Sequence, residues 1–320
     1  MSKSDTHSVH GIVLLDKPPG LSSNAALQRV RRLYGRPTAG HTGSLDPLAT
    51  GMLPICLGEA TKIAGLLLGG RKAYETQIAL GRRTSTGDTE GEVIEEAPLP
   101  ALTRMEVEAR LARLVGPQLQ TPPMFSAVHV GGKRLYELAR QGLEVERAAR
   151  PIEILALELG QFATDRLTLS VACTTGTYIR TLAEDVARAL GTVGHVTRLH
   201  RQWVEPFQAA SMHTLAALER IAASGADALA QVVLPLEQAL TGTPEIHLDA
   251  EAARRLAQGQ RVPAEGNPGL KVVFGPLRHL LGLGELSPEG SLHARRLFTW
   301  AIDSKACAQP NAVESVPGGR

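Results

Sequence analysis

The 320-residue sequence predicts an α+β protein with a mixed, largely antiparallel central sheet flanked by helices, and a small β-rich module at its C-terminal end. Segments with alternating apolar residues, typical of strands, are interspersed with segments at helical spacing. The two do not alternate regularly, as they would in a doubly wound parallel sheet. A hydrophobic content of 43% and a charged content of 21% are typical of a soluble globular protein with a packed core.

The order of the elements follows from local signals. Ser22 or Ser23 stands where a helix N-cap is expected, and Gly35 ends that helix. Thr103, followed three residues later by Glu106, forms a capping box that opens another helix. The expected strands lie at 11–15, 73–80, 152–159 and 167–173, and the expected helices at 22–34, 103–114 and 178–190.

A change in composition near residues 241–244 predicts a boundary between two domains. Short apolar runs separated by Gly and Pro follow it, at 271–274, 279–283 and 292–300, and Asp249 is expected to cap a short helix that ends near Ala257. A module of roughly sixty residues is marginal for independent stability. The last residues, from about Gln309, are rich in Pro and Gly and are expected to be disordered.

Composition also excludes several classes of protein. Cys56, Cys173 and Cys307 have neither disulfide-framework nor metal-ligand spacing, which is typical of a reducing compartment. No run approaches the roughly 20 apolar residues that a membrane span needs, and the first residues lack the apolar core of a signal peptide. We therefore expect a cytoplasmic protein without a metal site or a membrane contact.

The most informative segment is 40–51, Gly-His-Thr-Gly-Ser-Leu-Asp-Pro-Leu-Ala-Thr-Gly. It is too rich in Gly, Thr and Pro for a helix or a central strand, and Pro47 restricts Asp46 before it to an extended conformation. A lone carboxylate on such a loop, with His41 five residues away, has the properties of a nucleophile or a general base. Spacing alone explains Asp46 equally well as a turn former.

Basic residues are gathered in three short clusters, although the formal net charge is only +2. The clusters lie at 29–36, 71–83 and 195–201. Each alone is more typical of a solvated face than of a binding patch. Three clusters near one candidate site favour a surface that contacts phosphates.

Segment 41–62, HTGSLDPLATGMLPICLGEATK, resembles the catalytic motif of the bacterial tRNA pseudouridine-55 synthases, the TruB family. The resemblance implies that Asp46 is the catalytic residue. It continues through segments 15–23, 72–74, 80–88, 120–127, 136–142 and 176–180, and so covers most of the chain. Two positions depart from the pattern: Phe125 and Ser85 stand where many members have Tyr and Asp.

The family's reaction follows from this resemblance. It implies an enzyme of the pseudouridine synthase fold that flips out uridine 55 of the tRNA TΨC loop. The enzyme then breaks the glycosidic bond and rejoins the base through C5. No cofactor is expected, since the isomerisation is redox-neutral and gains no group. The resemblance also suggests a second role in tRNA folding.

The resemblance implies supporting roles for five further residues. Arg180 would pair with the aspartate and keep it ionised. The alternative is a surface arginine at a helix start, where a cation is slightly unfavourable, so the functional role is favoured. Tyr74 would stack on the uracil; by spacing it is a half-buried strand residue. His41 would fill the gap left by the flipped uridine, and Ile179 and Leu199 would exclude water. By spacing alone, these last three read as a loop histidine and two core residues.

The remaining expectations concern RNA binding and domain organisation. The residues expected to contact RNA are Lys17, Lys62, Arg140 and Arg201. The resemblance implies a catalytic domain over 1–244 with an RNA-clasping insertion at about 119–150, a PUA-like RNA-binding domain over 245–308, and a tail over 309–320. The expected partner is tRNA, contacted at its T-arm, elbow and acceptor stem by a monomer that needs no other protein.

Three other classes of protein were weighed. A non-catalytic RNA-binding protein on the same scaffold is disfavoured because Asp46, Tyr74 and Arg180 are all present. A phosphate-binding NTPase is disfavoured because the sequence has no G-x-x-x-x-G-K-(S/T) motif. A glycosidase would need two carboxylates at one site, and the sequence indicates only Asp46.

Overall fold

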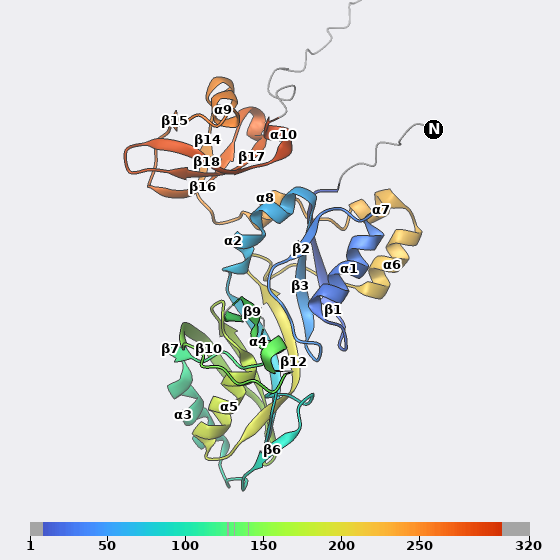
Figure 1. Ribbon diagram of the computed structural model, residues 1–320, viewed down its shortest axis with the longest axis vertical. Helices are drawn as coiled ribbons and strands as arrows, with labels where there is room; N and C mark the ends of the chain where they lie inside the picture. The colour runs from blue at the N-terminus through green and yellow to red at the C-terminus, as the bar shows by residue number, and fades with distance from the viewer. Residues whose placement is uncertain (1–8, 127, 131, 140, 303–320) are drawn as a thin grey trace, which may run out of the picture.

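The computed structural model describes residues 9–126, 128–130, 132–139 and 141–302. Its main body is a nine-stranded mixed sheet with helices packed against it, and a separate five-stranded sheet forms a C-terminal lobe (Figure 1). The α+β class predicted from the sequence is confirmed. The predicted tail at 309–320 and Arg140 lie outside the described residues.

The main sheet carries the candidate site. Its strands are β1 (Gly11–Lys17), β2 (Ala39–His41), β3 (Thr50–Leu57), β4 (Lys72–Leu80), β7 (Gly116–Gln120), β10 (Arg150–Ala163), β11 (Arg166–Cys173), β12 (Gly194–Val204) and β13 (His213–Thr214). Their order is β13-β1-β3-β12-β4-β11-β10-β7, with β2 paired to β3. The pairs β1–β13 and β3–β12 are parallel, and the others are antiparallel.

The three helices expected at 22–34, 103–114 and 178–190 are present within a residue or two of these bounds, the second as an α-helix followed by a 3-10 turn, and the main body has further short helices that were not predicted. These helices are α1 (Ser23–Leu33), η1 (Gly58–Ile63), α2 (Ala64–Leu68), α3 (Arg104–Leu111), η2 (Ala112–Leu114), α5 (Ile179–Leu190), α6 (Leu215–Ala223), α7 (Ala226–Ala230) and α8 (Leu236–Ala239). Ser22 is the N-cap of α1, and Thr103 and Glu106 form the predicted capping box of α3. Gly191 ends α5 in a left-handed conformation.

Two hairpins lie outside the main sheet. One joins β5 (Arg82–Thr84) to β6 (Val93–Glu96), and the other, β8 (His129–Val130) and β9 (Lys133–Arg134), precedes α4 (Leu135–Ala139). Residues of the first hairpin, of the segment from Leu119 to Arg147 and of α5 line one common cavity. These three segments therefore surround a cavity at the face of α5 that carries Arg180.

The C-terminal lobe consists of β14 (Glu245–His247), α9 (Ala250–Ala257), β15 (Val262–Pro263), β16 (Gly269–Phe274), η3 (Pro276–Arg278), β17 (Leu280–Leu286), β18 (Ser291–Leu297) and α10 (Thr299–Ile302). Asp249 caps α9 as predicted. The apolar run at 292–300 divides into a strand and a helix.

The lobe does not have a wholly separate core. Val272, Phe274 and Phe298 belong to one apolar cluster with Ile12 and Met52 of the main sheet. Removing the lobe would therefore uncover apolar surface on the main body. Within the described residues, no helix has both the length and the apolarity needed to cross a membrane.

Candidate active site

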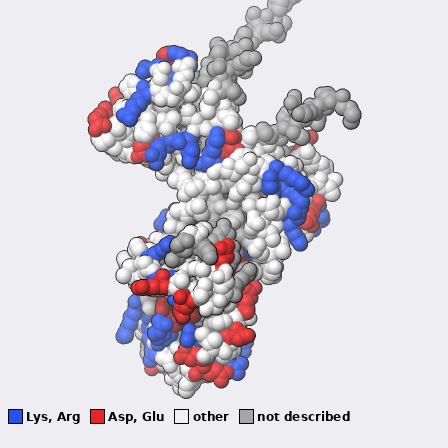
Figure 2. Space-filling view, viewed as in Figure 1, with Lys and Arg blue, Asp and Glu red and all other residues white. Residues whose placement is uncertain are grey.

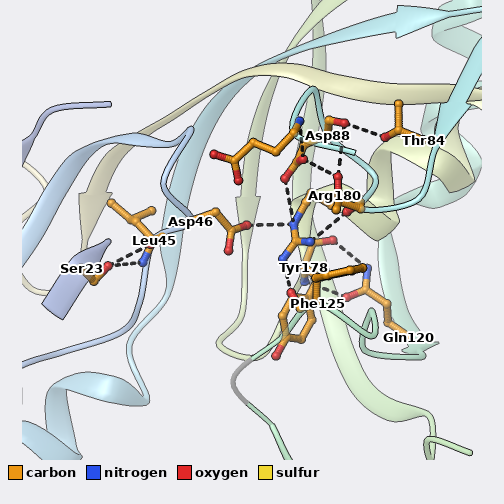
Figure 3. Close-up of polar contacts among 11 residues, drawn as sticks. Ser23, Leu45, Asp46, Thr84, Asp88, Gln120, Phe125, Tyr178 and Arg180 are labelled. Atoms are coloured by element: carbon orange, nitrogen blue, oxygen red, sulfur yellow. Dashed lines mark hydrogen bonds and ion pairs between the residues drawn. The ribbon is translucent and has the colours of Figure 1, made fainter. Parts of the chain in front are cut away.

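Asp46 lies in the loop between β2 and β3, and this loop is held at several points. The Ser23 hydroxyl accepts a hydrogen bond from Leu45 N (2.7 Å) and donates to Leu45 O (2.9 Å), as Figure 3 shows. Gly20 N donates to Pro47 O (2.8 Å) on the other side of the aspartate. The residues before and after Asp46 are thus both fixed, and its carboxylate is presented in a defined position.

Lys17 is fully buried and holds the same loop through a hydrogen bond to the main chain after Asp46. Its ammonium group donates to three backbone carbonyls, those of Pro18 (2.9 Å), Leu21 (2.7 Å) and Pro47 (3.3 Å). All three donors of the lysine are therefore used within the protein. A side chain so placed anchors the loop that carries Asp46, and the expected contact of Lys17 with RNA stays a prediction.

Arg201 is also buried, and it joins the loop to the sheet. Its Nε donates to Met52 O (2.7 Å) and its guanidinium donates to Gly43 O (3.0 Å). Gly51 lets β3 approach closely here: at φ 98°, a Cβ on it would lie 2.2 Å from Arg201 O. Arg201 therefore supports this strand pair, and its expected contact with RNA stays a prediction.

Arg180, at the start of α5, binds Asp46. Its Nε lies 2.8 Å from Asp46 Oδ2 and 3.8 Å from Asp88 Oδ2 (Figure 3). Its two terminal nitrogens donate to Thr86 O (2.9 Å) and to Phe125 O (2.7 Å). Only 4% of the side chain is exposed, so the interpretation of Arg180 as a surface arginine is wrong.

The protonation of Asp46 reflects opposing influences. Its side chain is 37% exposed and lines a cavity, but surrounding protein atoms desolvate it, and this burial raises the pKa of the carboxyl above its ordinary value. The charge of Arg180 lowers that pKa, whereas the charge of Asp88 raises it. Arg180 is thus the largest of the influences that favour the ionised, nucleophilic form of Asp46.

Sequence reasoning missed Asp88, which is only 2% exposed. Thr86 Oγ1 donates to its Oδ1 (2.5 Å), as does Glu90 N (3.0 Å), and Thr84 Oγ1 donates to its main-chain carbonyl (2.6 Å). Glu90 itself lines the Asp46 cavity, and burial raises its pKa. The Thr-x-Thr-x-Asp-x-Glu pattern at 84–90 was the available signal, but no spacing rule links it to an aspartate forty residues earlier.

Gln120 is a second missed residue, and it positions the helix that carries Arg180. Its side-chain amide accepts a hydrogen bond from Tyr178 N (2.7 Å) and donates to Tyr178 O (3.2 Å). Tyr178 is the N-cap of α5 but makes no side-chain cap itself. The buried amide of Gln120 therefore fixes the first turn of α5.

The cavity around Asp46 has a volume of about 710 Å³. It is lined by residues of the α1 N-terminus, the Asp46 loop, the β5–β6 hairpin and the segment before β8: Ser22, Ser23, Asn24, His41, Ser44, Leu45, Asp46, Pro47, Thr86, Asp88, Glu90, Phe125, Ser126 and Arg180. His41 Nδ1 and Ser126 Oγ are buried here without a hydrogen-bond partner. Burial and the nearby Arg201 charge lower the pKa of His41, so its ring is neutral near pH 7.

The other three expected residues are near the site but do not line this cavity. Tyr74, Ile179 and Leu199 are 7%, 4% and 5% exposed and belong to the main apolar cluster. Burial raises the pKa of the Tyr74 hydroxyl, and Arg201 opposes this through its charge and a hydrogen bond. In this structure these side chains are part of the buried apolar core.

Lys62 lies away from this cavity, at the junction with the C-terminal lobe. It pairs with Glu59 (2.8 Å) and donates to Leu297 O (2.9 Å), with 31% of its side chain exposed. Within the described residues, no group of three or more His, Cys, Asp or Glu side chains is placed to hold a metal ion.

The centre of the candidate site is an arrangement of two carboxylates around one guanidinium, formed by Asp46, Arg180 and Asp88 at an open cavity.

Comparisons with known proteins agree over most of the chain. The family model described as TruB family pseudouridylate synthase (N terminal domain) matches residues 31–179. The models for the tRNA pseudouridylate synthase B C-terminal domain and for Pseudouridine synthase II TruB, C-terminal, match 180–241 and 244–298. The chain thus contains the successive regions of one family.

Curated relatives are similar to this chain over nearly their full length. The tRNA pseudouridine synthase B of Xanthomonas campestris pv. campestris (strain B100) is 48% identical over 93% of this chain and 97% of its own length. That of Nitrosococcus oceani is 47% identical over 91% of this chain and 95% of its own length.

Among solved structures, the fold is similar to a chain of a Cbf5-Nop10-Gar1 complex, with a TM-score of 0.69 and 22% identity over 93% of this chain and 82% of that one. It is also similar to a chain of the archaeal box H/ACA sRNP Nop10-Cbf5 complex, with a TM-score of 0.71 and 21% identity over 95% and 90% of the two chains. These likenesses concern the fold. The relatives' identity of 47–48% over nearly their full length shows that the chain belongs to the TruB family of pseudouridylate synthases.

Proposed function

We propose that this protein converts uridine 55 in the TΨC loop of tRNA to pseudouridine, with Asp46 as the catalytic residue. The observation that carries the proposal is the ion pair between Arg180 and Asp46 at the edge of an open cavity. A carboxylate that must react with a base or a sugar has to be ionised and reachable. Arg180 favours the first condition and the cavity supplies the second.

The reaction breaks the bond between ribose C1′ and uracil N1, turns the freed base and forms a bond from C1′ to C5. The target uridine is stacked inside folded RNA, so extruding it costs a few kcal/mol. Polar groups at the cavity, among them His41 Nδ1 and Ser126 Oγ, have free capacity for hydrogen bonds with a flipped nucleotide. Tyr74 would stack on the uracil once the site closes on it, and Ile179 and Leu199 would exclude water.

The remaining parts of the proposal concern the whole molecule. A catalytic domain over 1–244, with its insertion at 119–150, would hold the T-arm and elbow, while a PUA-like domain from 245 would reach the acceptor stem. The enzyme would act as a cytoplasmic monomer, without a cofactor or a protein partner. An enzyme that opens the tRNA elbow would also assist its folding.

The test is incubation of purified protein with an unmodified tRNA transcript, followed by mapping of pseudouridine along the RNA. We expect one modified position, uridine 55, and none in a transcript with cytidine there. Asp46→Asn, which removes the charge but hardly alters shape, should lower the rate by about 10⁴-fold or more while tRNA binding stays close to normal. Appreciable product from this variant would remove Asp46 from the proposed role, and modification elsewhere would overturn the assigned target.

A further inference from the structure

A groove of about 630 Å³ lies between the main body and the C-terminal lobe, and the active site does not use it. It is lined by Thr61, Lys62, Gly65, Arg295, Arg296 and Leu297. Three of these six residues are cationic and none is acidic. Figure 2 shows Lys and Arg side chains gathered along the edge of the lobe that faces the main body.

The two arginines share the groove because β18 is irregular at this point. Ala294 pairs with Gly284 and Arg296 with Leu283, so Arg295 is an extra residue between successive pairs. Neighbouring residues of a regular strand point to opposite faces of the sheet. A bulge redirects a side chain, and here it allows two consecutive arginines to line one groove.

Gly282 on the neighbouring strand supports the same geometry. Its φ is 141°, and a Cβ on it would lie 2.2 Å from Arg296 O and 2.8 Å from Leu297 Cα. Any other residue would push β18 away from β17 at the place where the arginines stand. Gly282 therefore allows β17 and β18 to lie close together at the position of the two arginines.

The main-body side of the groove is joined firmly to the lobe. Lys62 Nζ donates to Leu297 O (2.9 Å), and Glu59 accepts a hydrogen bond from Thr299 N (2.6 Å). Glu59 also pairs with Lys62. The three cationic groups are thus held at one junction although they come from two domains.

The arginines are only weakly neutralised by the protein. Glu285 lies 3.6 Å from Arg295, and both side chains are partly exposed, so this pair contributes little. Arg296 has no carboxylate within ion-pair distance among the described residues. An anion that enters the groove therefore meets two forked guanidinium donors without displacing a strong internal partner.

We propose that this groove binds backbone phosphates of the tRNA at a site distant from the flipped uridine. The inference rests on the proposed function, because it takes the same RNA as the ligand. Adjacent phosphates of one strand match a row of cations, and no base-specific contact is needed. A substrate that engages both the groove and the Asp46 loop would be held at two points of one connected structure.

The test measures tRNA affinity against salt concentration in the Asp46→Asn background, so that it does not depend on turnover. The double variant Arg295→Gln/Arg296→Gln removes two cations from the groove. The double variant Arg254→Gln/Arg255→Gln removes two from α9 of the same lobe, outside the groove. Each lost phosphate contact should lower the slope of log Kd against log salt by about 0.9.

We expect the slope of log Kd against log salt to be lower by about 1.8 in the groove variant than in the parent. Between about 50 and 200 mM KCl, the increase in Kd of the groove variant should therefore be about 10-fold smaller than that of the parent. The α9 variant should keep the parental slope. Arg295→Lys/Arg296→Lys should restore most of the slope, since the point charges return. Equal slopes in all variants, or failure of the lysine variant to restore it, would overturn the groove as a phosphate site. A wild-type protein that binds tRNA with this slope but forms no pseudouridine would instead overturn the proposed reaction.

Discussion

Ser23 and Leu45, far apart in the sequence, exchange two hydrogen bonds through one hydroxyl group. The contact joins the first turn of α1 to the residue before Asp46. Ser22, its neighbour, has a different task, because it caps the helix. Of these two adjacent serines, Ser22 therefore stabilises the helix and Ser23 stabilises the loop.

Ser23→Ala should reduce kcat by roughly tenfold with little change in KM, because the loop that presents Asp46 loses its anchor. Leaving the buried Leu45 groups without a partner should also lower the free energy of unfolding by about 1–3 kcal/mol. Ser22→Ala is the matched control: loss of the cap costs about 1 kcal/mol but leaves the loop contact intact. If both variants lose kcat equally, the effect comes from α1 and not from the loop.

Arg180→Met should nearly abolish activity and lower the free energy of unfolding by up to about 3–5 kcal/mol, since it removes the counter-charge of the buried Asp88 and of the partly exposed Asp46. Arg180→Lys should also be poor, because an ammonium group cannot reproduce the four contacts of the guanidinium. Burial raises the pKa of Asp46, and the charge of Arg180 lowers that pKa. Loss of the arginine should therefore raise the pKa of Asp46 further. The rise of residual single-turnover activity with pH should therefore shift to higher pH. An unchanged pH profile would show that Arg180 does not control the ionisation of Asp46.

Lys17→Met tests whether this lysine anchors the loop or contacts RNA. Because its ammonium is enclosed by three carbonyls, we expect losses in thermal stability and in kcat. The slope of log Kd against log salt for tRNA should not change, since no phosphate contact is removed. A slope lower by about 0.9 in a protein of normal stability would support the RNA contact that the sequence suggested.

Tyr74→Phe should keep stability and tRNA affinity but lose rate, because only the hydroxyl is removed. Tyr74→Leu should lose both rate and about 2 kcal/mol of stability, since the ring fills part of the main apolar cluster. Rate measurements with tRNA and thermal unfolding of both variants provide the comparison. Equal behaviour of the two would exclude a contribution from the aromatic ring.

Local signals predicted much of the fold and the centre of the site. The caps at Thr103 and Asp249 and the αL end at Gly191 depend on nearby residues, so they are visible in the sequence. The loop around Asp46 was likewise marked by its Gly and Pro residues. What such signals cannot reveal is which distant groups meet a side chain.

Long-range packing explains what the sequence did not reveal. Lys17 and Arg201 look like surface cations because a sequence shows charge and not burial; only the fold brings carbonyls from other strands around them. Asp88 was missed because its partner comes from a helix ninety residues later. The boundary near Pro244 separates two sheets, but Phe274 and Phe298 still pack into the cluster that contains Ile12, and composition gives no sign of this sharing.

The hydrogen bond from Arg180 to Phe125 O connects the segment before β8 to the guanidinium that also binds Asp46. Because the acceptor is a main-chain oxygen, this contact does not depend on the side chain of residue 125. Movement of this segment changes the set of partners around the guanidinium, and with it the proton affinity of the aspartate. Linkage works in both directions, so each proton that Asp46 gains or loses also biases the position of the segment. The position of this segment and the acidity of the aspartate are therefore linked through one guanidinium.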